Sequence, residues 1–270
     1  MQHLKEKSKE IRLKIFKTIV NAGKGHVGGA FSCVDLIVGL YYGNSFKFDP
    51  KNPTWENRDR FFFSKGHAGL ALYVLLADLG YFSEEELLKY NVGGGKIAEH
   101  PDTRLPGIES VSGSLGHGLG LGCGLALSSK LNNYSNDFYT YVLLGDGECN
   151  EGLIWESAMF ASHHKLSNLV TIIDRNKLSV LDHTENIIKL EPFADKWNSF
   201  GWEVKEIDGH SSLEINNVFK YSKERKSEKP LLILANTIKG KGVSYMENKV
   251  NWHHGVPNKE QIEVALKELE

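Results

Sequence analysis

Apolar side chains recur at helical spacing near the start of the chain, so residues 4–21 are predicted to form an amphipathic helix. Ile11, Ile15 and Ile19 fall on its apolar face, and lysines fall on the opposite face. Residues 21–29 follow, and they contain too much glycine to continue the helix. Further helices are predicted over residues 32–42 and 67–80, with a polar, proline-containing connection over 48–56.

The second half of the chain alternates between short apolar runs and longer segments of helical pattern. Strands are predicted at residues 139–144, 169–174, 202–207 and 231–235, and helices at 152–164, 192–200 and 211–227. Strands that alternate with helices predict an α/β fold, in which a parallel sheet carries helices on both faces. Because no repeat or linker interrupts the pattern, we expect one domain over residues 1–270, with a short, charged helical tail from about residue 258.

Charge and cysteine content exclude several classes of protein. Lys and Arg number 32 against 34 Asp and Glu, a formal net charge of −2, whereas nucleic-acid binders usually carry a basic excess. The three cysteines, Cys33, Cys123 and Cys149, are too few and too distant for a disulfide framework or a cysteine-based zinc site. The charged N-terminus does not resemble a secretory signal, and no apolar run has the length of a membrane span. We therefore expect a cytoplasmic protein with no nucleic-acid or membrane partner.

Polar residues directly follow two of the predicted strands. Asp146 comes after the first strand and Asn176 after the second. Because ligands bind at the carboxyl edge of a parallel sheet, these two oxygen-bearing side chains predict a site for Mg²⁺ or Ca²⁺. Gly147 opens the next helix, where a backbone N–H can approach an anion. The alternative is an ordinary strand-to-helix turn in which Asp146 caps the helix.

The segment 145–152, together with Asp174-Arg175-Asn176, resembles the thiamine-diphosphate motif of the transketolase family. Other segments agree with that family in the same order, so that the resemblance covers roughly residues 5–257: 21–26, 57–67, 99–102 with 105–109, 112–118 and 253–257. It implies a thiamine-diphosphate-binding fold and transfer of a two-carbon ketol unit from a ketose, expected to be phosphorylated, to an aldose. Two alternatives stay open: another thiamine-dependent lyase or ligase, such as a deoxyxylulose-phosphate synthase type, and a non-catalytic relative.

The resemblance also implies how the cofactor is held. Asp146, the Asn176 side chain and the Leu178 carbonyl would bind the metal ion against the diphosphate. Other positions that match the cofactor site of the family are His67 and His254 at the diphosphate, Gly147, Lys239, and Gly113 and Leu115 at the aminopyrimidine end. Either Lys239 or Lys241 could reach a phosphate, and a solvated lysine pair is the alternative. For the glycines 118–124, close helix packing is the alternative to a binding role.

Catalytic roles are likewise implied for histidines. His26, His100 and His254 would face the reacting sugar and move protons on its hydroxyl groups, which suits a side chain that titrates near neutrality. His117 stands where the family usually has glutamine, so that its role is open. Glu151, also a candidate catalytic residue, is similar to a family glutamate near the subunit boundary.

The family's pyrimidine-activating glutamate has no counterpart in this sequence. In full-length transketolases it belongs to a second domain, whereas residues 258–270 alone follow the region of resemblance. We therefore expect a separately encoded C-terminal subunit with the pyrimidine-binding domain to complete the enzyme. Self-association into a two-fold heterotetramer is expected as well, because closed symmetry is the common arrangement of oligomers.

Overall fold

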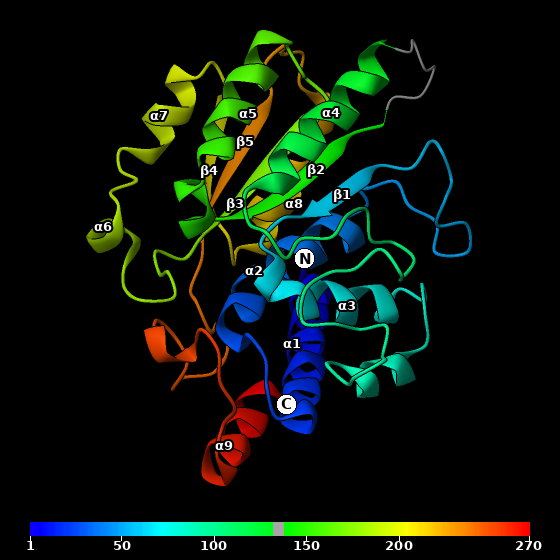
Figure 1. Cartoon of the computed structure of the whole chain (residues 1–270), viewed down its shortest axis with the longest axis vertical. Coiled ribbons are helices and arrows are strands. Elements are labelled where there is room, and N and C mark those ends of the chain that lie inside the picture. The colour runs from blue at the N-terminus through cyan, green and yellow to red at the C-terminus, as the bar shows by residue number, and fades with distance from the viewer. Residues whose placement is uncertain (132–137) are drawn as a thin grey trace.

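A computed structural model describes residues 1–131 and 138–270, and within these ranges one parallel sheet forms the centre of the molecule (Figure 1). Its strands are β1 (Arg60–Phe63), β2 (Thr140–Gly145), β3 (Leu169–Arg175), β4 (Glu203–Asp208) and β5 (Leu231–Asn236). They lie in the order β1-β2-β3-β5-β4, and every neighbouring pair is parallel. The predicted α/β fold with a parallel sheet is confirmed.

Each face of the sheet has its own apolar core, because successive side chains of a strand point to opposite faces. Tyr141 and Leu143 belong to the core under α1 (Gln2–Ala22), α2 (Val27–Tyr42), α3 (Gly69–Asp78) and α8 (Ser212–Glu224). Val142 and Leu144 belong to the core under α4 (His117–Leu131), α5 (Gly152–His163) and α7 (Phe193–Ser199). Shorter elements are η1 (Gly66–Ala68), η2 (Glu84–Lys89), η3 (Gly147–Asn150), α6 (Thr184–Ile187) and η4 (Val250–Trp252).

Close approach explains why glycine-rich segments are helical in two places. Helix α2 begins at Val27, five positions before its predicted start at residue 32, and Gly28 lies in its first turn. A Cβ at Gly28 would lie 2.5 Å from the carbonyl oxygen of Trp252, so that only glycine permits this contact. In α4, a Cβ at Gly122 would lie 2.6 Å from Val142 Cγ2. Close packing, one of the two interpretations of this glycine run, is therefore confirmed at Gly122, whereas an added Cβ at Gly124 would meet no atom within 4 Å.

The predicted C-terminal tail is helix α9 (Lys259–Leu269), which packs beside α1 (Figure 1). Asn258 and Gln261 form a reciprocal capping box at its start.

The three cysteines are buried and free. Over the two described ranges, no helix combines the length and the apolar character that a membrane crossing requires.

The register of the sheet brings the predicted site residues to one edge. Gly145 at the end of β2 pairs with Asp174 on β3, and Arg175 on β3 pairs with Asn236 on β5. The segments that leave these three strands therefore begin side by side at the carboxyl edge, where parallel α/β sheets bind their ligands.

Candidate active site

A cavity of about 310 Å³ opens at this carboxyl edge. Its walls come from the segments after β2 and β3 and from loops of the other elements. It is lined by Gly29, Lys65, His67, His100, Gly113, Leu115, Gly145, Asp146, Gly147, Glu148, Asn176, Leu178, Ser179, Val180, Lys239 and His253.

The carboxylate of Asp146 is buried at the base of the cavity. It accepts hydrogen bonds from the backbone amides of Gly147 at 2.7 Å and Lys177 at 2.6 Å. The guanidinium of Arg175 lies 3.3 Å from its second oxygen. Burial raises the pKa of Asp146, and the negative charge of Asp174 raises it further. A cation bound beside Asp146 would favour the ionised carboxylate.

Two more oxygen ligands line the same cavity. The side-chain oxygen of Asn176 accepts a hydrogen bond from the Leu178 amide at 3.1 Å, which fixes its orientation. The carbonyl oxygen of Leu178 accepts from Lys239 Nζ at 3.3 Å, so it is open to a positively charged group. Carboxylate, amide and backbone carbonyl oxygens together are a donor set that suits a hard divalent cation.

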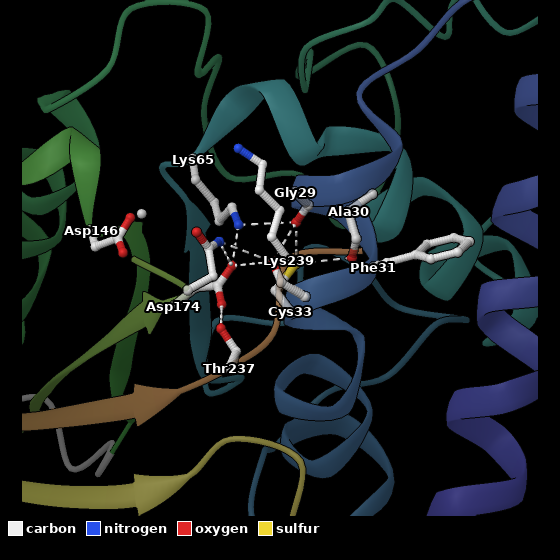
Figure 2. A network of polar contacts seen from close by, with 12 residues as sticks. Gly29, Ala30, Phe31, Cys33, Lys65, Asp146, Asp174, Thr237 and Lys239 are labelled. Atoms are coloured by element: carbon white, nitrogen blue, oxygen red, sulfur yellow. Dashed lines mark hydrogen bonds and ion pairs between the residues drawn. The ribbon is translucent and has the colours of Figure 1, made fainter. Parts of the chain in front are cut away.

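A buried ion pair between Lys65 and Asp174 lies near Asp146 (Figure 2). Lys65 Nζ pairs with Asp174, and both side chains are almost fully shielded from solvent, with 1% and 0% exposed. Asp174 also accepts hydrogen bonds from the hydroxyls of Ser32 and Thr237. Burial lowers the pKa of Lys65, but the charge of Asp174 outweighs it and holds that pKa above its usual value. Lys65 is therefore a fixed positive charge in the cavity wall.

Replacing Lys65 with Met should destabilise the fold by about 3–5 kcal/mol, because Asp174 would be left as an uncompensated buried charge. The free energy of unfolding in denaturant at pH 7 measures this loss, with the exposed Lys24→Met as control. The loss should shrink as the pH falls, since protonation of Asp174 removes the unpaired charge. A loss below about 1 kcal/mol would contradict the role of this pair.

Lys239 and the histidines His67 and His253 also line the cavity. Lys239 Nζ lies 2.8 Å from His253 Nδ1 and donates to the Ser179 carbonyl at 2.9 Å. Burial, together with the positive charge of Lys65, lowers the pKa of Lys239 to about 8. Burial and the positive charge of Lys65 also hold the pKa of His67 well below its usual value. An anion bound here would meet several donors and relieve the repulsion between the two lysines.

A second group of histidines lies beside this part of the lining. The ring of His26 contacts the rings of His67 and His253, with centroids 5.6 and 5.3 Å apart. On its other side it lies 4.6 Å from the ring of His254 and 6.2 Å from that of His100. The arrangement therefore brings together oxygen ligands that suit a cation, donors that suit an anion and a cluster of imidazole groups.

Comparison with known proteins identifies the family. The sequence model described as "Transketolase, thiamine diphosphate binding domain" matches residues 4–269. The chain belongs to the transketolase family. This transketolase domain is 42% identical to one of the subunits of an apulose-4-phosphate transketolase from Phocaeicola vulgatus, and the alignment covers 100% of this chain and 94% of that protein. It is also 42% identical to a 6-deoxy-6-sulfo-D-fructose transketolase subunit of a Clostridium species, covering 99% and 96% of the two chains.

Single-chain transketolases match over the same region but extend beyond it. Human transketolase is 33% identical, and the alignment covers 100% of this chain and 42% of the human protein. The crystal structure of transketolase from Campylobacter jejuni superposes with a TM-score of 0.92 at 32% identity and covers 100% of this chain and 43% of the other. The predicted resemblance to the N-terminal subunit of a split transketolase is thus confirmed, as is the fold.

Most of the predicted site residues of this transketolase domain line the cavity: His67, His100, Gly113, Leu115, Asp146, Gly147, Asn176, Leu178 and Lys239. His26 lies behind this lining, in ring contact with His67. His254 is not part of the lining, and 46% of its side chain is exposed, whereas its neighbour His253 lines the cavity. Glu151 is exposed at the start of α5, outside the cavity lining.

Sequence reasoning assigned no role to Lys65, Glu148 or His253, all of which line the cavity. Glu148 is buried and accepts hydrogen bonds from the amides of Gly116 and Gly145, each at 2.9 Å. Lys65 and Glu148 lie within the sequence motifs that carry the family resemblance. That position was the one feature of the sequence that could have identified them as site residues. Their burial and their partners, however, depend on contacts between distant segments.

The residues present fit thiamine diphosphate and a divalent metal ion. The lysines and histidines of the lining suit the diphosphate, and Asp146, Asn176 and the Leu178 carbonyl suit the metal. Open space surrounds Gly113, where an added Cβ would meet no atom within 4 Å. That position leaves room for a bulky group in the cavity.

Proposed function

We propose that this chain is the N-terminal, cofactor-binding subunit of a two-subunit transketolase that transfers a two-carbon ketol unit from a phosphorylated ketose to an aldose. The observation that carries this proposal is the single cavity in which Asp146, Asn176 and Leu178 meet Lys65 and Lys239. The match to proteins named as separate transketolase subunits, over nearly their whole length, supports the two-subunit arrangement.

In this proposal, Asp146, Asn176 and the Leu178 carbonyl hold Mg²⁺ or Ca²⁺, and His67, Gly147 and Lys239 hold the diphosphate. Gly113 and Leu115 contact the aminopyrimidine end. When bound, thiamine diphosphate supplies the stabilised carbanion chemistry that carbon–carbon cleavage requires. The protein contributes orientation and fixed charges, since the lysines are held in place before any ligand arrives.

The histidines would act on the sugar. His100 lines the cavity, and His26 and His254 lie next to one another beside it. We assign them to hydrogen bonds with sugar hydroxyls and to proton transfer as the carbonyl of the ketose and its neighbouring hydroxyl react. Burial is the largest influence on the pKa of His26 and lowers it, so that this imidazole is neutral at pH 7 and able to accept a proton.

A partner subunit would complete this site. We propose that it carries the pyrimidine-binding domain, and that two copies of each subunit form a heterotetramer. Glu151, exposed at the start of α5, is assigned to the boundary between subunits. A cytoplasmic location stays a prediction.

The test is a screen of ketose donors and aldose acceptors, with Mg²⁺, thiamine diphosphate and the candidate partner subunit present. Phosphorylated sugars are compared with their unphosphorylated forms, and products are identified by mass spectrometry. Ketol transfer to at least one aldose supports the proposal. Cofactor turnover that releases the donor fragment without transfer to any aldose would contradict it.

Replacing Asp146 with Ala should weaken thiamine diphosphate binding in the assembled enzyme at least about tenfold, or ~1.4 kcal/mol, because a charged metal ligand is lost. Asp146→Asn removes the charge but keeps an acceptor for the Lys177 amide, so it separates metal binding from folding. The exposed Asp195→Asn is the matched control. Titration of the cofactor at fixed Mg²⁺ measures the effect, and an unchanged titration in both Asp146 variants would refute the metal assignment.

A further inference from the structure

Glu99 lies between two of the proposed sugar-facing histidines, and no role was assigned to it. Its Oε1 atom is 2.8 Å from His26 Nδ1 and 3.3 Å from His254 Nε2. Both Glu99 Oε1 and His26 Nδ1 are shielded from solvent, and among the described residues neither atom has a regular hydrogen bond, so that their 2.8 Å approach is an ion-pair contact. One carboxylate oxygen therefore contacts a ring nitrogen of each histidine.

Separate anchors hold the segment of Glu99 in place. Tyr73 donates from its hydroxyl to the carbonyl of His100 at 2.7 Å. Pro101 packs against Gly69, where an added Cβ would lie only 2.5 Å from the proline ring. These contacts hold residues 99–101 against helix α3, so that the backbone from which the Glu99 side chain extends is fixed in position.

The two histidines are anchored to each other as well. The amide of Gly255 donates to the carbonyl of Gly25 at 3.1 Å, which joins the backbone beside His254 to the backbone beside His26. The carboxylate and both rings thus come from three distant parts of the chain, each fixed by its own contacts. The contacts of Glu99 with His26 and His254 therefore depend on the fold as a whole and not on the conformation of one loop.

The charges favour an ionised Glu99. Burial raises the pKa of Glu99, but the nearby imidazoles and the Asn91 amide outweigh it, so this pKa is lowered overall. A ring nitrogen 2.8 Å from a carboxylate oxygen must carry the proton, since two lone pairs would repel each other. In neutral His26 the proton therefore lies on Nδ1, and Nε2 is the acceptor.

We propose that Glu99 is a positioning residue of the ketol-transfer site, which holds His26 and His254 each in one tautomer and orientation. Neutral His26 then presents Nε2, and neutral His254 presents Nδ1, as the proton-accepting atom. The catalytic consequence of this inference rests on the proposed function. The tautomer of His26, in contrast, can be measured in this chain without the partner subunit or any activity. Other titratable groups that face His26 are His67, His100 and His253, along with His254.

The test uses Glu99→Ala and Glu99→Gln. The alanine variant should lower kcat at least about tenfold in the assembled enzyme, because misplaced catalytic groups lose that much or more. Glutamine should recover part of the loss, since its carbonyl can still accept from the ring nitrogen. Affinity for thiamine diphosphate should stay within about twofold of the unchanged enzyme, because Glu99 does not line the cavity. Asp102→Asn, a carboxylate lost from the same loop, is the matched control.

Nitrogen NMR of the histidine rings in the isolated chain gives a readout that does not depend on activity. His26 should be protonated on Nδ1 in its neutral form, and this preference should disappear in Glu99→Ala. Its pKa should also fall in both variants, since the negative charge of Glu99 raises it. All samples are passed over chelating resin before Mg²⁺ is added, because two imidazoles and a carboxylate also suit Zn²⁺.

The outcomes separate the two proposals. Absence of ketol transfer by the unchanged chain with its partner would defeat the proposed function, while the NMR result would still decide the positioning role. A His26 tautomer that is the same in all variants, or a kcat of Glu99→Ala within twofold of the unchanged enzyme, would overturn the inference about Glu99. Unfolding midpoints of each variant show whether a lost activity reflects a lost fold, and Glu99→Gln is the variant that preserves the shape of the site.

Discussion

The purified chain alone should catalyse no measurable ketol transfer, and addition of the partner subunit should restore it. Among the described residues, the carboxylates that line the cavity are Asp146 and Glu148. Asp146 is held by the amides of Gly147 and Lys177, and Glu148 by the Ser64 hydroxyl and two backbone amides. Neither is free to activate the pyrimidine ring. Loss of a positioned acid–base group typically costs about 10²–10⁴-fold in rate.

The measurement compares this chain, the partner and their mixture at equal concentrations, with product formation followed for each. Asp146→Ala mixed with the partner, assayed at limiting thiamine diphosphate, is the control for contaminating transketolase from the expression host, since its weaker cofactor binding should leave its activity at least about tenfold lower. Turnover by this chain alone that disappears in Asp146→Ala would show that the chain is a complete enzyme. A mixture that is active should also elute at a larger size than either subunit.

Replacing His26 with Ala should lower kcat about 10²-fold or more while cofactor binding stays largely unchanged, and the same holds for His100→Ala. The reason is the position of these rings: His26 lies behind the cavity lining, and its ring contacts those of His100 and His254.

Cofactor titration and steady-state kinetics on the assembled enzyme separate the two effects. His163→Ala, an exposed histidine at the end of α5, is the control for loss of an imidazole in general. If His26→Ala loses the cofactor but keeps its turnover at saturation, then His26 is a cofactor ligand and the division of roles among the histidines is wrong.

Local sequence signals were sufficient where a segment carries its own pattern. The buried runs over residues 139–144, 169–174 and 231–235 are strands β2, β3 and β5, because continuous apolar residues of strand length mark the centre of a parallel sheet. The turn residues that follow β2 and β3 then placed Asp146 and Asn176 at the same edge. The spacing of Asp146 and Asn176 in the sequence does not by itself bring them together. They meet because parallel strands have their carboxyl ends at the same edge of the sheet.

Other features depend on contacts that no local pattern records. Strand β1, only four residues long, was not predicted, because its length is below that of a recognisable period. The early start of α2 depends on the distant Trp252, whose carbonyl occupies the space beside Gly28. Likewise, the burial of Lys65 against Asp174 and the reach of Glu99 toward His26 follow from packing between segments far apart in the chain.

The strand order has a consequence for the sequence of events during synthesis. Strand β4 lies at the edge of the sheet and pairs with β5, which comes later in the chain and inserts between β3 and β4. A nascent chain therefore releases β4 before its neighbour exists, and such non-local parallel pairing is slow. The segment after β5 also carries Lys239 and His253 into the cavity wall. A ribosome-bound chain that lacks residues 231–257 therefore has neither the neighbour of β4 nor this part of the cavity wall.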